Sequence, residues 1–447
     1  MGVFYSVNML FSESKNIKKS VKEVLEHEKF AKMTDVQEKT LKEPNSDLIV
    51  QAPTGSGKTL CFVIPLANFL IDSPTKGVKA LIILPTRELS IQIKEVADKF
   101  GINNEIFMGG GDSPINIIKE NTNLIIGTPG RLLYLMKDQA SHFSRLKYLI
   151  LDEADKLLSQ GFESQLQAIF NYIPKKNRRT LMFSATIDAS VRKLAVKLGN
   201  FKEIISGENK IPENLKIRYL KVTSNLKLKV MGTIYKQKTI VFFSTCAEVD
   251  FFYEILIKNS LFNTKVVKLH GRLDQTRRTE IHNEIKNLEQ FLLLTTDVSA
   301  RGIDFKSANL VIHFDVPKDS SNILHRSGRV GRNGESGESV LFLMPNETKY
   351  LNYLKLKYQE VKLENFDMEN INNIFNTYEN LEKPPELIKL GATAFVSYIR
   401  SYKEHFVNYI LNYKDLDLEQ LKETFCLHKL PKMSEIASIK KAQQKHQ

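Results

Sequence analysis

The sequence has few cysteines and no clustered ones. Only Cys61, Cys246 and Cys426 occur among 447 residues, and they form no CxxC pair or cysteine–histidine cluster. Disulfide frameworks need paired cysteines, and structural zinc sites need closely spaced cysteine and histidine ligands. We therefore expect three free thiols, with neither a disulfide framework nor a zinc site.

Long hydrophobic runs are also missing. The longest apolar stretches, such as residues 239–244 and 291–294, are far shorter than the roughly 20 residues that span a bilayer. Residues 1–11 are apolar but lack a basic n-region, and the charged residues 13–19 follow directly. These features do not fit a secretory signal. We expect no transmembrane helix and a protein that stays inside the cell.

Acidic residues are too few to balance the basic ones. Lys and Arg number 64 and Asp and Glu 51, which gives a net charge of +13. This excess favours a polyanionic partner, with nucleic acid ahead of a membrane surface. Apolar residues make up 42% and charged residues 26%, which is ordinary globular usage and excludes a chain that is mainly disordered. A length of 447 residues predicts about three folding units.

Short, continuous apolar runs alternate with helical patterns in the first half of the chain. Continuous runs are typical of strands that helices cover on both faces, so they predict an α/β fold with a doubly wound parallel sheet. These runs lie at residues 48–51, 80–84, 123–127, 148–151 and 180–183.

The same alternation of short apolar runs with helical patterns begins again after a polar stretch at residues 206–214. We interpret the two halves as a diverged tandem duplication of one domain, followed by a mainly helical C-terminal extension with a basic tail. The expected domains are residues 1–206, 207–345 and 346–447. The apolar runs of the second half lie at residues 239–243, 265–269, 291–294 and 309–313.

A glycine-containing loop follows the first apolar run. Between a strand and a helix, such a loop turns backbone N–H groups toward a polyphosphate. Lys58 would then pair with the β- and γ-phosphates, and the Thr59 hydroxyl would ligate Mg²⁺. A chance turn of small residues is the alternative. The loop consists of Ala52, Pro53, Thr54, Gly55, Ser56, Gly57, Lys58 and Thr59.

An acidic segment, Asp152-Glu153-Ala154-Asp155, follows the run at residues 148–151. Asp152 therefore projects from the carboxyl edge of the predicted sheet, where ligands bind in such folds. There its carboxylate could hold Mg²⁺ opposite Thr59, and Glu153 could orient or deprotonate an attacking water. Alone, this segment would be a solvated acidic turn, but together with the phosphate loop it predicts a nucleotide-hydrolysing site.

In this order, the motifs strongly resemble those of the DEAD-box RNA helicases of superfamily 2, over residues 11–345. The resemblance implies two RecA-like domains and RNA-stimulated hydrolysis of ATP with Mg²⁺. It implies that Gln37 contacts the adenine, helped by Phe30 and the upstream Phe11, and that Asp304 contacts the ribose. Lys29 stands where the family usually has glycine.

The resemblance also assigns residues that couple hydrolysis to strand separation. These are Ser184 and Thr186, with Asp155 and His325. An arginine-rich segment at residues 325–332 would let Arg329 and Arg332 reach the γ-phosphate as an arginine finger. In the second domain, residues 243–248 follow what we take as its first strand and contain neither glycine nor a Lys-Thr pair. The chain should therefore bind one ATP.

Hydroxyls, glycine amides and arginines lie near predicted strand ends in both domains. Such groups suit phosphate contacts, which position RNA without reading its sequence. The family places RNA across both sets, and its preference for RNA over DNA is an inference from the resemblance. The predicted RNA-binding residues are Pro85, Thr86, Arg87, Gly110, Thr128, Pro129, Gly130, Arg131, Gln275, Arg278, Thr296 and Arg301.

An apolar stripe marks a helix in the C-terminal extension. Phe395, Tyr398, Ile399, Tyr402 and Phe406 recur at helical spacing and predict packing against the second domain. We expect the charged residues of the other face, including Lys403, to stay free for phosphates. The segment resembles the extension of nucleolar DEAD-box helicases that assemble the large ribosomal subunit.

The resemblance therefore implies a nuclear, nucleolar enzyme that remodels precursor ribosomal RNA. Its expected partners are RNA and proteins of pre-ribosomal particles, with no membrane, and the chain is expected to be a monomer. Two alternatives remain open. One is a messenger-RNA helicase in translation or splicing, and the other is an ATP-gated RNA clamp with little unwinding.

Overall fold

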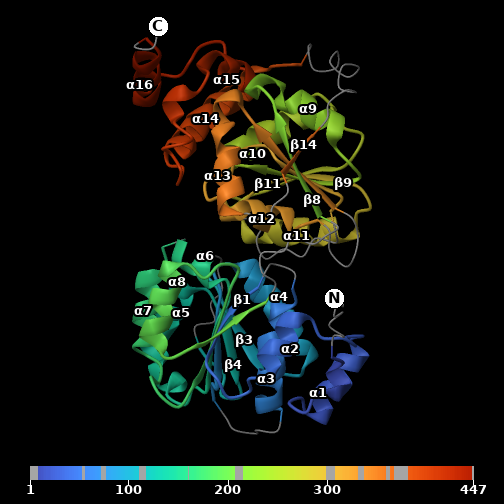
Figure 1. The fold of residues 1–447 in the computed structure, drawn as a ribbon, viewed down its shortest axis with the longest axis vertical. Coiled ribbons are helices and arrows are strands. Elements are labelled where there is room, and N and C mark those ends of the chain that lie inside the picture. Colours follow the sequence, from blue (N-terminus) through green and yellow to red (C-terminus); the bar gives the residue numbers. More distant parts are fainter. Residues whose placement is uncertain are drawn as a thin grey trace, which may run out of the picture. The chain divides into compact units, whose positions relative to one another are not determined.

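The computed structural model describes residues 9–52, 56–71, 77–109, 117–159, 161–206, 215–297, 308–330, 337–358, 363–366 and 381–444. The chain divides into two compact units, Met1–Glu208 and Asn209–Gln447. Each unit contains a parallel sheet of seven strands with helices on both faces (Figure 1). The two sheets confirm the predicted α/β fold class with two tandem doubly wound domains. Among the described residues, no helix combines the length and apolarity that crossing a bilayer requires.

The first sheet has the strand order β3-β4-β2-β5-β6-β1-β7. All five apolar runs predicted for this half are strands, and their side chains are almost entirely buried. β3 and β7 were not predicted, because both lie at sheet edges and carry polar or exposed residues. The strands are β1 (Leu48–Gln51), β2 (Ala80–Ile83), β3 (Asn104–Phe107), β4 (Leu124–Gly127), β5 (Tyr148–Leu151), β6 (Arg179–Ser184) and β7 (Lys202–Ile205).

Helices connect these strands and cover the sheet. Several begin at a residue whose side chain accepts a hydrogen bond from the first turn, such as Thr86 before α4 and Asp188 before α8. The helices are α1 (Lys19–His27), α2 (Asp35–Leu41), α3 (Lys58–Leu70), α4 (Arg87–Lys99), α5 (Pro129–Gln139), α6 (Ala154–Ser159), α7 (Glu163–Phe170) and α8 (Ala189–Leu198).

The second sheet repeats the topology of the first. Its strand order, β10-β11-β9-β12-β13-β8-β14, is the first order with each strand number raised by seven. This match supports the interpretation as a tandem duplication. The strands are β8 (Leu215–Lys221), β9 (Lys238–Phe243), β10 (Val266–Leu269), β11 (Phe291–Thr296), β12 (Leu310–His313), β13 (Gly337–Leu343) and β14 (Leu363–Asn365).

The topology corrects one prediction about the second unit. β8 precedes β9, so β8 and not β9 is the counterpart of β1. Residues 222–226, which follow β8, therefore replace the phosphate loop, and they also lack glycine. The sequence did not show β8, because its exposed and buried residues alternate, so no continuous apolar run marks it.

The C-terminal extension packs on the second sheet's helices. The long helix α14 lies against α10, and its residues Phe395, Tyr398, Ile399 and Tyr402 are buried in the same hydrophobic core as the second sheet. This confirms the predicted packing of the stripe. The remaining helices are α9 (Lys227–Ile234), α10 (Cys246–Lys258), α11 (Gln275–Asn287), α12 (Ser321–Ser327), α13 (Lys349–Lys357), α14 (Pro385–Lys403), α15 (Leu418–Thr424) and α16 (Ser434–Gln443).

Two details of the predicted stripe were wrong. Phe406 is 61% exposed, because α14 ends at Lys403 and the helical spacing no longer applies beyond it. Lys403 is not free for phosphates, since its ammonium lies 3.5 Å from a carboxylate oxygen of Glu435 and over the ring of Tyr413. The extension therefore uses this charge, at least in part, to hold its own helices together.

Candidate nucleotide site and nucleic-acid interface

The phosphate loop lies between β1 and α3, as predicted. Gly57 has φ +86°, and an added Cβ would come within 2.5 Å of Gln37 Nε2, so a glycine is required there. The Lys58 ammonium donates a hydrogen bond to the carbonyl oxygen of Ala52 at 2.8 Å. The lysine side chain thus folds back across the loop. Pro53, Thr54 and Gly55 lie outside the described residues.

The start of α2 is tied to this loop. Thr34 Oγ1 donates to the carbonyl of Ser56 at 2.8 Å, and Gln37 Nε2 donates to the carbonyl of Gly57 at 3.0 Å. Gln37 Oε1 also accepts a bond from the Thr34 backbone N–H, which closes a capping box. These bonds place Gln37, predicted to contact adenine, directly beside the phosphate loop.

The two predicted aromatic residues have different surroundings. Phe30 is 42% exposed as a residue, whereas Phe11 is 2% exposed and packs in the core. The Phe11 backbone N–H donates to the carbonyl of Ala31 at 3.0 Å. Phe30 therefore offers a free ring, and Phe11 supports the segment that carries it.

Asp152 and Glu153 follow β5, where the sequence placed them. Glu153 has φ +51°, a strained conformation for a residue with a side chain, and its Oε2 atom is buried without a hydrogen-bond partner in the described part of the chain. Burial, reinforced by the charges of Glu153 and Asp155 and opposed by Lys58, raises the pKa of Asp152 to about 7. Buried acids with an unpartnered oxygen fit a divalent cation bound beside a polyphosphate.

Replacing Asp152 with asparagine should stabilise the nucleotide-free protein more at pH 8 than at pH 5. The pKa of Asp152 is raised from 3.8 to about 7, because the folded protein favours the neutral carboxyl. The stability that depends on this neutral form is present at low pH and is lost as the pH rises to 7. Asparagine does not ionise. The stability difference between variant and wild type should grow by about 2 to 3 kcal/mol between these pH values, measured by denaturant unfolding.

The exposed residue Asp138 supplies the matched control, Asp138→Asn, for this measurement. The change in stability between the two pH values should be larger for Asp152→Asn than for this control. A pH-independent effect of Asp152→Asn would contradict the raised pKa.

Ser184 connects the acidic segment with the end of β6. Its Oγ lies 2.8 Å from Asp155 Oδ1 and 2.7 Å from the Thr186 carbonyl oxygen, and it accepts a hydrogen bond from the Asp155 N–H at 3.2 Å. β6 pairs with β1, and Ser184 lies opposite Gln51. The structure therefore brings together three of the predicted coupling residues, and it places them beside the strand that leads into the phosphate loop.

The strand order separates a second group of residues from the nucleotide site. β3, β4 and β2 are neighbours, and Ile83 of β2 pairs with Gly127 of β4. Parallel strands end at one edge, so the segments after β2 and β4 lie side by side. These segments contain the predicted RNA-binding residues Pro85, Thr86, Arg87, Thr128, Pro129, Gly130 and Arg131.

Glycines leave space at this edge. An added Cβ at Gly109 or Gly130 would meet no atom within 4 Å, so an incoming backbone could approach both. Gly130 belongs to the first turn of α5, and the N-terminus of a helix attracts anions. Thr86 is instead buried, and its hydroxyl caps α4 by accepting from the Leu89 N–H at 3.4 Å. The edge suits phosphate contacts made mainly by backbone and arginine groups.

The second unit has a matching edge formed by β10, β11 and β9. Thr296, at the end of β11, is buried and lies opposite Phe243 of β9. Gln275 and Arg278 lie in the first turn of α11, which follows β10. Strand order thus places Thr296 and the start of α11 along one edge. Gly110 and Arg301 lie outside the described residues, as does the side chain of Gln275.

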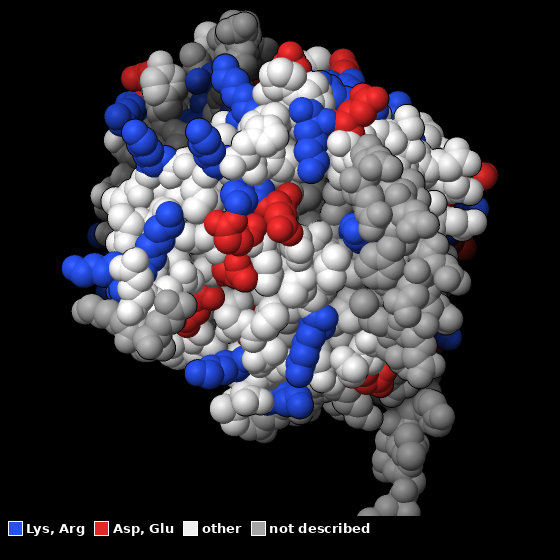
Figure 2. Space-filling view, turned by 90° about the horizontal axis from the view of Figure 1, so that it is seen from above, with Lys and Arg blue, Asp and Glu red and all other residues white. Residues whose placement is uncertain are grey.

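Basic side chains are spread widely rather than confined to one site. On the face shown in Figure 2, Lys and Arg side chains are scattered over the described surface, with one group of Asp and Glu side chains near the middle and others toward the edges. A distributed positive charge attracts a polyanion in general. Specific contacts with RNA phosphates would then come from the groups at the strand ends, such as the backbone of Gly130 in the first turn of α5.

The arginine-rich segment begins in α12. His325 and Arg326 lie in the last turn of that helix, and Arg329, which follows it, is largely buried. Arg332 and Asp304 lie outside the described residues. No distance between these groups and the phosphate loop follows from the structure, because each unit is described by itself.

Sequence reasoning missed the buried role of Arg326. Its guanidinium binds both carboxylate oxygens of Asp297, at 2.6 and 2.8 Å, and donates to the carbonyl oxygen of Asp315 at 3.0 Å. It also lies over the Phe242 ring, 5.0 Å from the centroid. The arginine-rich segment gave no signal that its first arginine would be structural, because burial depends on strands distant in sequence.

Comparison with known proteins agrees with this arrangement. Residues 34–194 match the DEAD/DEAH box helicase family, residues 219–334 match the helicase conserved C-terminal domain, and residues 384–433 match the C-terminal extension of ATP-dependent rRNA helicases of the SPB4 type. The three matches follow the two sheets and the helical extension in order.

Whole-chain relatives show the same relationship. The chain is 44% identical over 431 residues to ATP-dependent rRNA helicase SPB4 of Encephalitozoon cuniculi (strain GB-M1), covering 94% of this chain and 91% of the relative. It is 35% identical over 445 residues to ATP-dependent RNA helicase DDX55 of Homo sapiens, covering 91% of this chain and 73% of the relative.

A solved structure extends the relationship to the fold. The chain is similar to the DEAD-box helicase Mss116 bound to ssRNA and UDP-BeF, with a TM-score of 0.80 and 29% identity, covering 92% of this chain and 89% of the other. The chain therefore belongs to the DEAD-box ATP-dependent RNA helicases, which hydrolyse ATP under stimulation by RNA, and carries an SPB4-like C-terminal extension.

Proposed function

We propose that this helicase remodels precursor ribosomal RNA during assembly of the large ribosomal subunit, in the nucleolus. The observation that carries the proposal is the extension. Residues 384–433 match the SPB4-like extension, and a relative 44% identical to this chain is named an rRNA helicase. The extension's buried stripe on α14 shares a core with the second sheet, so it is an integral part of the enzyme.

The ATP site is proposed to use residues of both units. Gln37 and Phe30 would hold the adenine, Asp304 the ribose, and Lys58 the phosphates, with Glu153 orienting the attacking water. Thr59 and Asp152 would hold Mg²⁺, which neutralises phosphate charge when bound. The unpartnered, buried Oε2 of Glu153 and the hydrogen bonds around Gly57 support these roles. Arg329 and Arg332 would stabilise the charge that develops on the γ-phosphate.

RNA is proposed to lie along the strand ends of β3, β4 and β2 and along those of β10, β11 and β9. The open space at Gly109 and Gly130 supports backbone contact in the first unit. Contacts of this kind fix the position of the RNA without selecting its sequence. Target choice would then depend on the extension and on partner proteins of the pre-ribosomal particle.

Ultraviolet crosslinking of the tagged full-length protein tests the proposed substrate. We expect crosslinks concentrated in precursor ribosomal RNA and a nucleolar signal from the tag. The Glu153→Gln variant should increase the crosslink yield, because it would hold RNA in a stalled complex, and the exposed-surface variant Glu163→Gln serves as its matched control. Crosslinks concentrated in messenger RNA would instead support a role in translation or splicing.

A duplex-unwinding assay separates a helicase from an ATP-gated clamp. A remodelling enzyme should separate a short RNA duplex in the presence of ATP and not with a non-hydrolysable analogue in its place. RNA-stimulated ATP hydrolysis without any strand separation would favour the clamp.

A further inference from the structure

A turn at the end of α14 contacts the segment that leads into α12. This turn, residues 402–406, donates a backbone hydrogen bond from the Phe406 N–H to the carbonyl oxygen of Lys318 at 3.2 Å. The Lys318 ammonium pairs with the Glu404 carboxylate at 2.7 Å. His405 is buried, and its ring meets that of Tyr350 edge-on at a centroid distance of 6.1 Å. The extension therefore holds residues 315–320 through the backbone hydrogen bond and the ion pair at Lys318.

Residues 315–320 in turn determine where α12 begins. Asp319 caps its first turn, because Oδ1 accepts from the Ser321 N–H at 2.9 Å. Ser320 Oγ lies 2.7 Å from the Lys357 ammonium. At the other end of the helix, Arg326 holds the Asp315 carbonyl and the Asp297 carboxylate. The segment therefore joins the extension to the helix that precedes Arg329.

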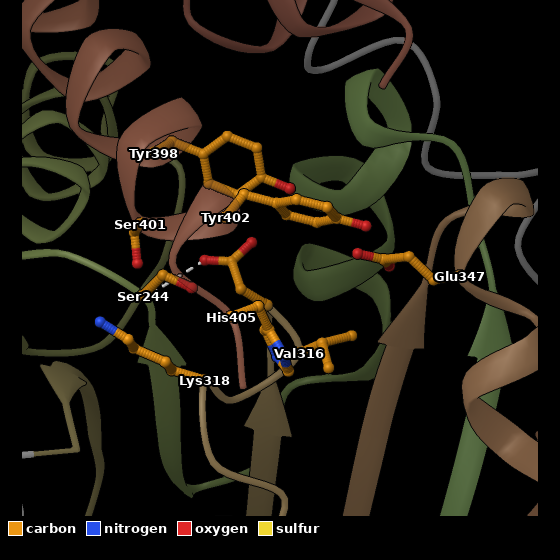
Figure 3. A pocket seen from close by; sticks show the side chains of 9 residues that line it. Ser244, Val316, Lys318, Glu347, Tyr398, Ser401, Tyr402 and His405 are labelled. Carbon is orange, nitrogen blue, oxygen red and sulfur yellow. Dashed lines mark hydrogen bonds between the residues drawn. The ribbon is translucent and has the colours of Figure 1, made fainter. Parts of the chain in front are cut away.

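A small pocket lies below this contact. It measures about 10 Å³ and is lined by Ser244, Asp315, Glu347, Tyr398, Tyr402 and neighbouring residues. Figure 3 shows the Tyr398 and Tyr402 rings of α14, with the Tyr402 hydroxyl toward Glu347, and His405 next to Val316. A volume of this size holds at most about one water molecule, so the pocket supports the contact and does not bind a nucleotide.

The pocket adjoins the second unit's counterpart of the nucleotide site. Lys227 is the first residue of α9, after β8, as Lys58 is the first residue of α3, after β1. The ammonium of Lys227 lies 3.3 Å from a carboxylate oxygen of Asp315, which follows β12, the counterpart of the strand before Asp152. Both partners are buried. In the first unit, Lys58 and Asp152 are proposed to bind ATP and its Mg²⁺. Their counterparts in the second unit, Lys227 and Asp315, instead form a buried ion pair with each other.

We propose that the turn at residues 402–406 positions α12, and with it the arginine-rich segment, for ATP hydrolysis. The proposal rests on the proposed role of Arg329 and Arg332 in that reaction. Residues 315–320 gain a backbone hydrogen bond and an ion pair from the turn, both at Lys318. The buried ring of His405 packs on Tyr350 of α13 and holds the turn in place. Loosening these contacts should let α12 shift, which lowers turnover. ATP affinity should not change, because the phosphate loop and Gln37 belong to the first unit, and Asp304, the proposed ribose contact, lies outside both α12 and residues 315–320.

The Phe406→Pro variant of the full-length protein tests this role. Proline removes the backbone N–H that binds Lys318, while the side chain it replaces is largely exposed. Phe406→Ala keeps the N–H and is the matched control. With poly(U) RNA, we expect Phe406→Pro to lower kcat for ATP about two- to tenfold, the effect of one lost hydrogen bond, with KM for ATP unchanged. Phe406→Ala should match wild type.

Melting temperatures and a second variant distinguish positioning from general destabilisation. His405→Ala, which removes the ring packed on Tyr350, should also lower kcat at a temperature where the protein remains folded. Wild-type kcat in both variants would overturn the proposal, and so would a kcat loss that only follows the loss of folded protein. If wild type itself shows no RNA-stimulated hydrolysis, the proposed function fails, and this inference fails with it.

Discussion

Replacing Glu153 with glutamine is expected to stop nearly all ATP turnover while leaving ATP binding intact. Glutamine keeps the size and hydrogen-bonding capacity of the side chain but cannot orient or deprotonate the attacking water as a carboxylate does. Loss of a general base typically lowers kcat by about 10² to 10⁴-fold. ATP and RNA should therefore accumulate on the enzyme together. Single-turnover hydrolysis and fluorescent-nucleotide binding measure the two effects separately.

Lys58→Ala should fail in a different way. The Lys58 ammonium crosses the phosphate loop, so its removal takes a positive charge from the phosphates themselves. A lost charge-assisted contact should weaken ATP binding about 10- to 100-fold. The exposed residues Glu163 and Lys175 supply controls of the same type, Glu163→Gln and Lys175→Ala. If Glu153→Gln and Lys58→Ala lost ATP affinity equally, the separate roles of the two residues would be wrong.

In the first sheet, the sequence predicted the five inner strands, which are buried on both faces, and it missed the two edge strands. In the second sheet it predicted the edge strand β10 but missed the inner strands β8 and β13 and the edge strand β14. Continuous apolar runs mark β1, β2, β4, β5 and β6, because hydrophobic burial selects their residues. β7 and β14 carry mostly exposed or half-exposed residues, and their positions depend on pairing with strands distant in sequence. Pairing of that kind leaves no local pattern, so the correspondence of β8 with β1 emerged only from the sheet order.

Motif residues were predicted more fully than the contacts that support them. The resemblance named Gln37, and the structure adds that its amide holds the Gly57 carbonyl. Lys29 stands where the family usually has glycine, and its φ of +62° explains why glycine is preferred there. Arg326 was part of a recognised motif, yet its bonds to Asp297 and Asp315 depend on how three strands meet. The spacing of a motif shows which residue types it contains. Only the folded structure shows that Arg326 has a structural role.

Two arginines of the arginine-rich segment, Arg326 and Arg332, should therefore respond differently to replacement by alanine. Arg326 is committed to Asp297 and largely inaccessible, so Arg326→Ala should destabilise the second unit. Removing one partner of a buried ion pair leaves the other charge unpaired, at a cost of about 3 to 5 kcal/mol. That variant should therefore melt at a lower temperature. Arg332→Ala should leave the melting temperature unchanged, if Arg332 acts on the nucleotide.

Arg332→Ala is expected to lower RNA-stimulated ATP hydrolysis by about 10³ to 10⁵-fold, the usual contribution of an arginine finger. Arg332→Lys should recover little of this loss, because an ammonium cannot reproduce the bidentate contact of a guanidinium with a phosphate. KM for ATP should change far less than kcat, since the contact forms mainly in the transition state. Arg192→Ala, on the exposed face of α8, is the matched control and should hydrolyse ATP like wild type. Full activity of Arg332→Ala, or of a chain that ends at residue 206, would show that hydrolysis needs only the first unit.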